Sequence, residues 1–128
     1  MKKSKKKILL VEGDHVVAEL YKDIFGQKFV IEMAHDGKDA LEKAKTAPDL
    51  ILIDVQTPGL NGYELLKSFK KDKSTKHIPV VLLSNFSSSH AEDDKKLALL
   101  LGAEDYLVKT HNQPQEILEK ISGYLTAE

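Results

Sequence analysis

The sequence predicts an α/β fold in which one sheet of five parallel strands carries helices on both faces. Five short apolar runs rich in Val, Ile and Leu recur along the chain, and none shows the clean alternation of a strand with one solvated face. Stretches with helical spacing of apolar residues lie between these runs. A chain of 128 residues with 41% hydrophobic and 30% charged residues fits one globular domain.

The expected strands are the apolar runs themselves: 7–11, 29–34, 49–54, 78–84 and 105–109. Parallel strands need a crossover that contains a helix, and such crossovers are right-handed. Five alternations of strand and helix therefore predict a doubly wound sheet of order 2-1-3-4-5, the flavodoxin-like arrangement.

The expected helices are amphipathic, with apolar residues at every third or fourth position. Their buried stripes should be Val16, Val17, Leu20, Tyr21 and Ile24; Ala40, Leu41 and Ala44; Leu65, Leu66 and Phe69; Leu97, Leu100 and Leu101; and Ile117, Leu118, Ile121 and Leu125. Local signals agree, with N-caps expected at Asp14, Asp36 and Asn61, a first turn at Pro114, and helix ends at Gly26 and Gly102.

Charge divides the chain into a basic leading arm and an acidic body. The stretch MKKSKKK holds five lysines, and the rest of the chain carries 14 lysines against 20 acidic residues. We expect residues 1–6 to be a flexible, solvated arm, the alternative being a tether to nucleic acid or membrane. Residues 7–126 should form the domain, with no output domain after it.

Composition excludes several classes of protein. There is no cysteine, so neither disulfides nor thiolate metal sites are possible, and there is no arginine, the usual bidentate reader of guanine. We therefore expect no nucleic-acid binding by the domain itself. The run ILLV is too short for a signal peptide and no later run approaches a membrane span, so we expect a cytoplasmic protein without membrane contact.

Acidic residues gather where the first and third expected strands end. Glu12 and Asp14 follow the first strand, and Asp54 ends the third. Ligands of doubly wound sheets bind at these carboxyl ends, near the switch point between strands 1 and 3. Two carboxylates about 4 Å apart repel by roughly 4 kcal/mol at an effective dielectric constant near 20, so a cation should neutralise them. Oxygen ligands without paired imidazoles favour Mg²⁺.

A hydroxyl and an ammonium group complete the set at the neighbouring strand ends. Ser84 ends the fourth strand and Lys109 ends the fifth. The combination predicts phosphoryl chemistry, with an aspartate as nucleophile and with a metal and a lysine balancing the phosphoryl oxygens. Taken alone, Asp54 could cap a turn and Lys109 could face solvent, but their joint placement favours a site.

Four stretches carry a family resemblance: KILLVEGD, PDLILIDVQTPGLNGYELL, IPVVLLSN and GAEDYLVK. On these stretches the chain resembles the receiver domain of two-component response regulators, of the single-domain, chemotaxis-regulator-like kind, over residues 6–126. The resemblance implies a signalling phosphoacceptor rather than an enzyme, limited to self-phosphotransfer and autodephosphorylation. Its partners would be a histidine kinase or histidine phosphotransfer protein and an unidentified downstream target.

The resemblance also implies roles for single residues. Asp54 would accept the phosphoryl group, Ser84 would be the switch hydroxyl, Lys109 would contact the phosphorylated aspartate, and Tyr106 would be the aromatic switch residue. Mg²⁺ would be bound by Glu12, Asp54 and the backbone carbonyl of Gln56, with Asp14 as a further candidate. Pro58 and Gly62 match the loop that leads into the third helix.

Three positions depart from the family pattern. Gly13 occupies the position whose carboxylate usually binds Mg²⁺ directly, so we expect weakened metal binding. Asn85 replaces the small residue that usually follows the switch hydroxyl, and Thr110 replaces a proline whose preceding bond is often cis. The Lys109–Thr110 bond is therefore either trans or a strained cis bond, because a cis bond without proline costs about 2.5–4 kcal/mol.

Alternative functions and a partner surface follow from the same residues. Gly13 and Asn85 favour a pseudo-receiver, an interaction module that works without phosphorylation. A flavin-binding loop would not be acidic, and a phosphatase of the haloacid dehalogenase type would need an acid in place of Gln56. In KKLALLLG we expect Leu99 to face outward, on the surface of the fourth helix, fifth strand and fifth helix, which in receivers commonly serves dimerisation or target binding.

Overall fold

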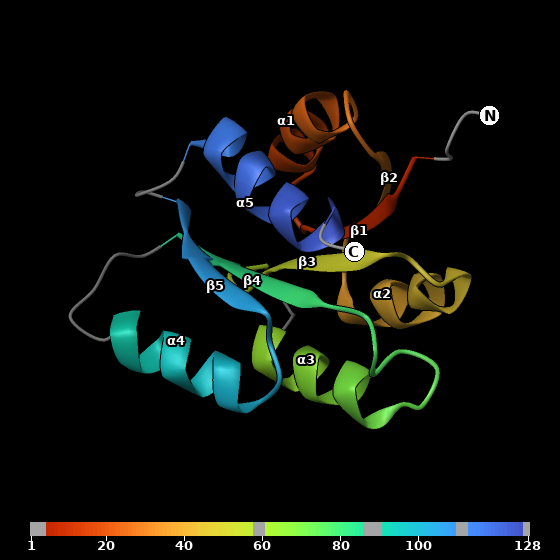
Figure 1. Ribbon diagram of the computed structural model, residues 1–128. Helices are drawn as coiled ribbons and strands as arrows, with labels where there is room; N and C mark the ends of the chain where they lie inside the picture. The colour runs from red at the N-terminus through yellow and green to blue at the C-terminus, as the bar shows by residue number, and fades with distance from the viewer. Residues whose placement is uncertain (1–4, 58–60, 86–90, 110–112, 127–128) are drawn as a thin grey trace.

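The computed structural model describes residues 5–57, 61–85, 91–109 and 113–126. Helices and strands alternate as predicted (Figure 1). The elements are β1 (Lys7–Val11), α1 (His15–Phe25), β2 (Val30–Ala34), α2 (Gly37–Lys43), the 3₁₀ turn η1 (Ala44–Thr46), β3 (Leu50–Asp54), α3 (Gly62–Lys71), β4 (Val80–Ser84), α4 (Ala91–Leu100), β5 (Asp105–Val108) and α5 (Pro114–Thr126).

The five strands form one parallel sheet of order β2-β1-β3-β4-β5, which confirms the predicted fold class. Helices α1 and α5 cover one face of the sheet, and α2, α3 and α4 cover the other (Figure 1). The chain leaves β1 toward one neighbour and returns on its other side as β3, so these two strands form the switch point. The carboxyl ends of all five strands therefore meet at one edge.

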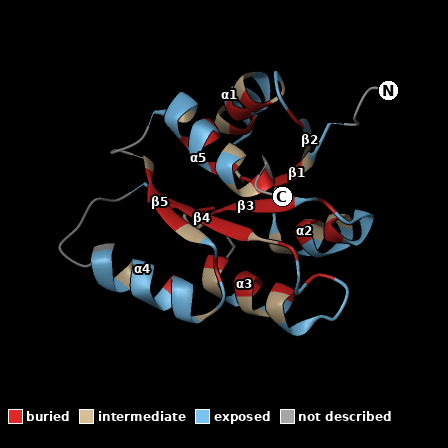
Figure 2. Cartoon of the chain, in the orientation of Figure 1, coloured by how far each residue is buried: buried red, intermediate tan, exposed pale blue. Residues whose placement is uncertain are grey.

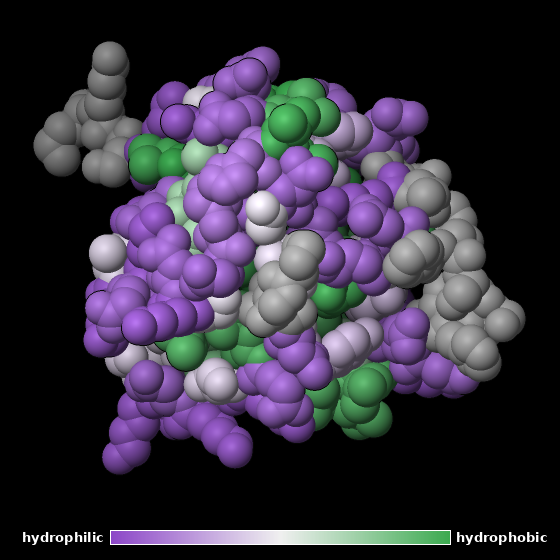
Figure 3. All heavy atoms as spheres, turned by 180° about the vertical axis from the view of Figure 1, so that it is seen from behind, coloured by the Kyte–Doolittle hydropathy of each residue, from purple (hydrophilic) through white to green (hydrophobic). Residues whose placement is uncertain are grey.

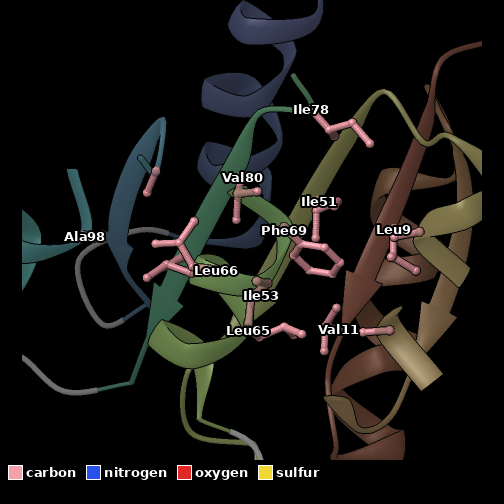
Figure 4. Close-up of a cluster of buried hydrophobic side chains, with 14 of the residues drawn as sticks. Leu9, Val11, Ile51, Ile53, Leu65, Leu66, Phe69, Ile78, Val80 and Ala98 are labelled. Atoms are coloured by element: carbon pink, nitrogen blue, oxygen red, sulfur yellow. The ribbon is translucent and has the colours of Figure 1, made fainter. Parts of the chain in front are cut away.

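Two hydrophobic clusters, one on each face, hold the helices to the sheet. The central strands β3 and β4 are buried along their whole length, whereas the edge strand β2 is partly exposed (Figure 2). In the cluster beneath α3, Leu65, Leu66 and Phe69 lie against Ile51 and Ile53 of β3 (Figure 4). Burial on both faces explains why the strands read as continuous apolar runs.

The predicted helix ends are largely confirmed. Asp14, Asp36 and Asn61 each accept backbone amide hydrogen bonds at the start of a helix, and Pro114 begins α5. Gly26 caps α1, and Gly102 follows α4 with a φ of +106°. No helix among the described residues is long and apolar enough to cross a membrane.

The predicted buried stripes are wrong at several positions. Residues expected in the core but found exposed are Val16, Leu20, Leu41, Leu97 and Leu100. In α1 the buried residues are Ala18, Tyr21 and Phe25. The small Ala18 lets the helix approach the sheet closely, and the two aromatic rings fill the space beside it, so this face packs more tightly than one through Val16.

Helix α4 also turns a different face to the sheet than predicted, because a small alanine packs there. Ala98 is fully buried against the sheet, and Leu100 is 84% exposed. The expectation that Leu97 and Leu100 face the sheet is therefore wrong, whereas Leu99 is exposed as expected. Seen from behind, hydrophobic atoms stand out near α4 on a largely hydrophilic surface (Figure 3).

We predict opposite effects of alanine at two helical glycines. A Cβ at Gly62 would lie 2.7 Å from Val55 Cγ1 and 3.2 Å from its Cα, so Gly62→Ala should lower the free energy of unfolding by about 1–3 kcal/mol. Gly123 lies inside α5 with nothing within 4 Å of its Cβ position, so Gly123→Ala should raise it by about 0.5–1 kcal/mol. Urea denaturation measures both, and unchanged stability of Gly62→Ala would contradict the close approach.

Candidate functional site

A hollow of about 330 Å³ opens at the carboxyl ends of β1, β3 and β5. It lies at the edge to which the sequence assigned the site. Its lining residues are Glu12, Gly13, Asp14, Val17, Asp54, Gln56, Asn85 and Lys109. Most of the site residues expected from the sequence are thus in one place, while Ser84 is buried beside the Gln56 side chain and Tyr106 lies in the core.

A buried ammonium and two buried carboxylates form the centre of the site. Lys109 Nζ donates a hydrogen bond to Asp54 Oδ2 and another, of 3.2 Å, to Glu12 Oε1. Asp54 is 2% exposed and Glu12 is 3% exposed. Lys109 follows β5, so its side chain connects the ends of three strands. The cation that the acidic pair requires is supplied here by the chain itself.

The charges in this cluster are unequally distributed. Burial raises the pKa of Glu12 to about 7, and a hydrogen bond to Asp54 and the negative charge of Asp54 act in the same direction. Burial also acts to raise the pKa of Asp54, but hydrogen bonds from Glu12 and Lys109 outweigh it, and the net pKa is lowered. Just below pH 7 the pair therefore holds one proton, on Glu12, and Asp54 is ionised.

Lys109 keeps its positive charge in this buried position. Burial acts to lower the pKa of Lys109, but the hydrogen bond and charge of Asp54 raise it above its ordinary value. An ionised carboxylate next to a fixed ammonium, both facing a hollow, is an arrangement suited to nucleophilic attack on an anionic phosphorus centre.

Asp14 is committed to the start of α1. Its Oδ1 accepts hydrogen bonds from the amides of Val16, at 2.9 Å, and Val17, at 3.2 Å. The Asp14 amide in turn donates to Glu12 Oε2 at 3.2 Å. Although Asp14 lines the hollow, its carboxylate already stabilises the start of the helix through Oδ1.

Gly13 is held by a threonine that sequence reasoning missed. The Gly13 amide donates a 3.1 Å hydrogen bond to Oγ1 of Thr57, which is 3% exposed. This bond ties the loop after β1 to the loop after β3. A hydroxyl residue three positions after Asp54 was the available signal, but the sequence does not show which backbone group it reaches.

Gln56 connects the ends of β3 and β4 through its side chain. The Gln56 side-chain Oε1 accepts from the Asn85 backbone amide at 2.6 Å, and the Gln56 backbone amide donates to Asp54 Oδ1 at 2.9 Å. Its Nε2 lies 3.4 Å from Ser84 Oγ. Sequence reasoning considered only the backbone carbonyl of Gln56, whereas the side chain orders the surroundings of the predicted switch hydroxyl.

Tyr106 lies in the core and not in the hollow. It is 6% exposed and belongs to the cluster between the sheet and α3 and α4. Tyr63 of α3 packs against the same cluster, and burial together with the neighbouring Tyr106 raises the pKa of the Tyr63 hydroxyl. The predicted aromatic switch residue is thus in an inward position.

The histidines near the site do not form a metal centre. The rings of His15 and His35 lie 4.0 Å apart, and His35 Nδ1 is 2.9 Å from the Glu12 carbonyl oxygen. Within the described ranges, no group of three or more His, Cys, Asp or Glu side chains could hold a metal ion. The Glu12 and Asp54 carboxylates nevertheless fit Mg²⁺, which takes one or two carboxylates and keeps several waters. The predictions for Pro58 and for the Lys109–Thr110 bond lie outside the described residues.

Comparison with known proteins places this geometry in a family. A family model described as the response regulator receiver domain matches residues 8–122. The chain is 38% identical over 120 residues to the transcriptional regulatory protein CpxR of Escherichia coli (strain K12), which covers 93% of this chain and 49% of that protein. The chain therefore spans about half the length of this curated relative.

Solved structures agree with the sequence comparison. The chemotaxis response regulator CheY4 of Vibrio cholerae has a TM-score of 0.83 and 27% identity, covering 95% of this chain and 100% of that one. A CheY-like response regulator receiver domain protein from Methanospirillum hungatei JF-1 has a TM-score of 0.82 and 27% identity, covering 95% and 94%.

The proton on Glu12 predicts a pH dependence of stability. The pKa of Glu12 is raised from 4.5 to about 7 in the folded chain. The stabilisation of the fold by protonated Glu12 is therefore complete below about pH 4.5 and is lost as the pH rises through 7. Relative to Glu12→Gln, the wild type should lose up to about 3 kcal/mol of unfolding free energy between pH 5 and pH 8. Urea denaturation in metal-free buffer measures this difference. Glu19→Gln on the exposed face of α1 is the control, and parallel pH profiles for wild type and Glu12→Gln would contradict the assignment.

Proposed function

The chain belongs to the response regulator receiver domains, and we propose that its Asp54 accepts a phosphoryl group from the phosphohistidine of a histidine kinase or a histidine phosphotransfer protein. Receiver domains interact with such proteins in two-component signalling. The observation that carries the proposal is the ionised Asp54 carboxylate, which faces the hollow with Lys109 bound to one of its oxygens.

The proposed step is a transfer between a nitrogen and an oxygen. An Asp54 oxygen attacks the phosphorus, the bond from phosphorus to the donor imidazole nitrogen breaks, and the imidazole leaves. Lys109 keeps its charge and balances the charge of the phosphoryl oxygens. The backbone amide of Gln56 donates to Asp54 Oδ1 and holds that oxygen in place. Ser84 offers a hydroxyl at the neighbouring strand end. The chain thereby acts as a phosphoacceptor, with self-phosphotransfer and autodephosphorylation as its only reactions.

Receiver domains bind Mg²⁺ at their phosphorylation site, where the ion supplies positive charge to the phosphoryl oxygens. In this chain Glu12, Asp54 and the Gln56 backbone carbonyl would hold it. We propose that the affinity is weakened, because Gly13 has no carboxylate and Asp14 is engaged as the cap of α1. In addition, Lys109 already donates hydrogen bonds to both remaining acids and balances the charge of Asp54.

The proposed output surface comprises α4, β5 and α5. Leu97, Leu99 and Leu100 are exposed on α4, more apolar area than this helix needs for its own packing. Asp105 joins the three elements, because its carboxylate accepts from Tyr124 of α5 at 2.5 Å and lies 3.6 Å from Lys95 of α4. We propose that this surface binds the downstream target or a second copy of the chain.

A second candidate function is a pseudo-receiver that binds partners without phosphorylation. Gly13 favours it, because it removes a metal ligand, and Asn85 favours it, because a polar side chain lines the entrance to Asp54. The phosphorylation experiment below separates the two functions, since a pseudo-receiver would bind its partner with Asp54 unmodified.

We predict that acetyl phosphate and Mg²⁺ add one phosphoryl group to the chain. Intact mass spectrometry should show a single adduct that is absent in Asp54→Asn and present in the control Asp36→Asn, whose side chain accepts from the Asp39 amide at the start of α2. An unmodified wild type at high Mg²⁺ would favour the pseudo-receiver, and an adduct that persists in Asp54→Asn would assign the phosphoacceptor elsewhere.

We also predict that Gly13→Asp tightens Mg²⁺ binding by about tenfold or more. Among the described glycines, the one with a positive φ is Gly102 and not Gly13. The backbone conformation at Gly13 is therefore one that an aspartate can adopt. Three carboxylates repel one another without metal, so this variant should be less stable in EDTA and should recover with Mg²⁺. NMR titration and thermal unfolding measure these effects. Gly123→Asp adds the same charge far from the site and serves as the control, and equal affinities would show that position 13 does not limit metal binding.

A further inference from the structure

Tyr21 lies at the boundary between the core and the phosphoacceptor site. It is 4% exposed in α1 and belongs to the cluster between the sheet, α1 and α5. Its ring stacks on Phe25 one turn later, with ring centroids 5.2 Å apart and an interplanar angle of 27°. From this side Tyr21 is an ordinary core aromatic residue.

Tyr21 has a second neighbour of a different kind. Lys109 Nζ lies over the ring, 5.3 Å from its centroid. That distance is within the range of a cation–π interaction, in which the negative face of the ring attracts an ammonium group. Burial raises the pKa of Tyr21, so the phenol stays neutral and acts on Lys109 through its ring and not as a phenolate.

Lys109 needs such a contact because its side chain is long and flexible. A lysine carries its charge on a flexible four-carbon stem, and its three donors rotate freely. The two carboxylates attract Nζ from one region, but hydrogen bonds alone do not fix the stem. The ring of Tyr21 limits where the Lys109 side chain can lie, and its negative face attracts the ammonium group. It leaves the N–H groups of Lys109 available for Asp54 and Glu12.

We propose that Tyr21 is a positioning residue that holds the Lys109 ammonium against Asp54 and Glu12 through the face of its ring. Its effect on phosphoryl transfer rests on the proposed function of Asp54, whereas its effect on Lys109 does not. Gly13 increases its importance, since a site with one carboxylate fewer has less negative charge to hold the lysine.

Three variants separate positioning from packing. Tyr21→Leu removes the ring, Tyr21→Phe keeps it without the hydroxyl, and Phe25→Leu removes an equally buried neighbouring ring that does not contact Lys109. NMR of the Lys109 ε-methylene protons should show an upfield ring-current shift in the wild type, Tyr21→Phe and Phe25→Leu. The shift should be lost in Tyr21→Leu.

The rate of phosphorylation by acetyl phosphate is the second readout. Tyr21→Leu should be slower by about threefold to tenfold, while Tyr21→Phe and Phe25→Leu stay within about twofold of wild type. Equal slowing in Tyr21→Leu and Phe25→Leu, or an unchanged ring-current shift in Tyr21→Leu, would overturn the proposal. Should Tyr21→Leu fail to fold, Tyr21→Met removes the ring with less loss of volume. A wild type that is not phosphorylated would refute the proposed function, and the NMR readouts would still decide the role of Tyr21.

Discussion

The buried contact of Lys109 with Asp54 and Glu12 is the interaction on which the rest of the site depends. Taking three charged groups out of water is costly, and such clusters add little net stability even when well paired. This cluster is tolerated because Glu12 holds a proton below about pH 7, which leaves one negative and one positive charge facing each other. The cluster is therefore an ionised carboxylate beside an ammonium group, and it contributes little to the stability of the fold.

The parallel sheet explains how these groups meet. Asp54 ends β3, Glu12 follows β1, and Lys109 follows β5, so the strand order sets the span that the lysine must cross. Hydrophobic clusters on both faces hold the helices to the sheet, and hydrogen bonds join the loops at the carboxyl ends of the strands. The Thr57 bond to Gly13 and the Gln56 bond to Asn85 are of this kind.

The strands, their order and the edge that carries the site could be predicted from the sequence, because apolar runs and strand-end residues are local signals. Which face of α1 and α4 packs on the sheet could not be predicted, because it depends on the small Ala18 and Ala98 fitting close to the strands. Hydrophobicity alone favours the leucines. The contact between Tyr21 and Lys109 was missed for a related reason, since it joins α1 to the end of β5 and leaves no local pattern.

Gly13 has different consequences for the resting site and for the reacting one. At rest, the charges of Lys109 and Asp54 already balance, so under the proposed weakening the two remaining acids would attract Mg²⁺ only weakly. In the proposed transfer, the carboxylate charge of Asp54 would be replaced by the larger negative charge of the phosphoryl group, which Lys109 alone would not balance. The demand for a metal is thus greatest during and after transfer. The proposed weak binding at rest is for this reason compatible with a functional phosphoacceptor, and the absence of a carboxylate at position 13 does not by itself make the chain a pseudo-receiver.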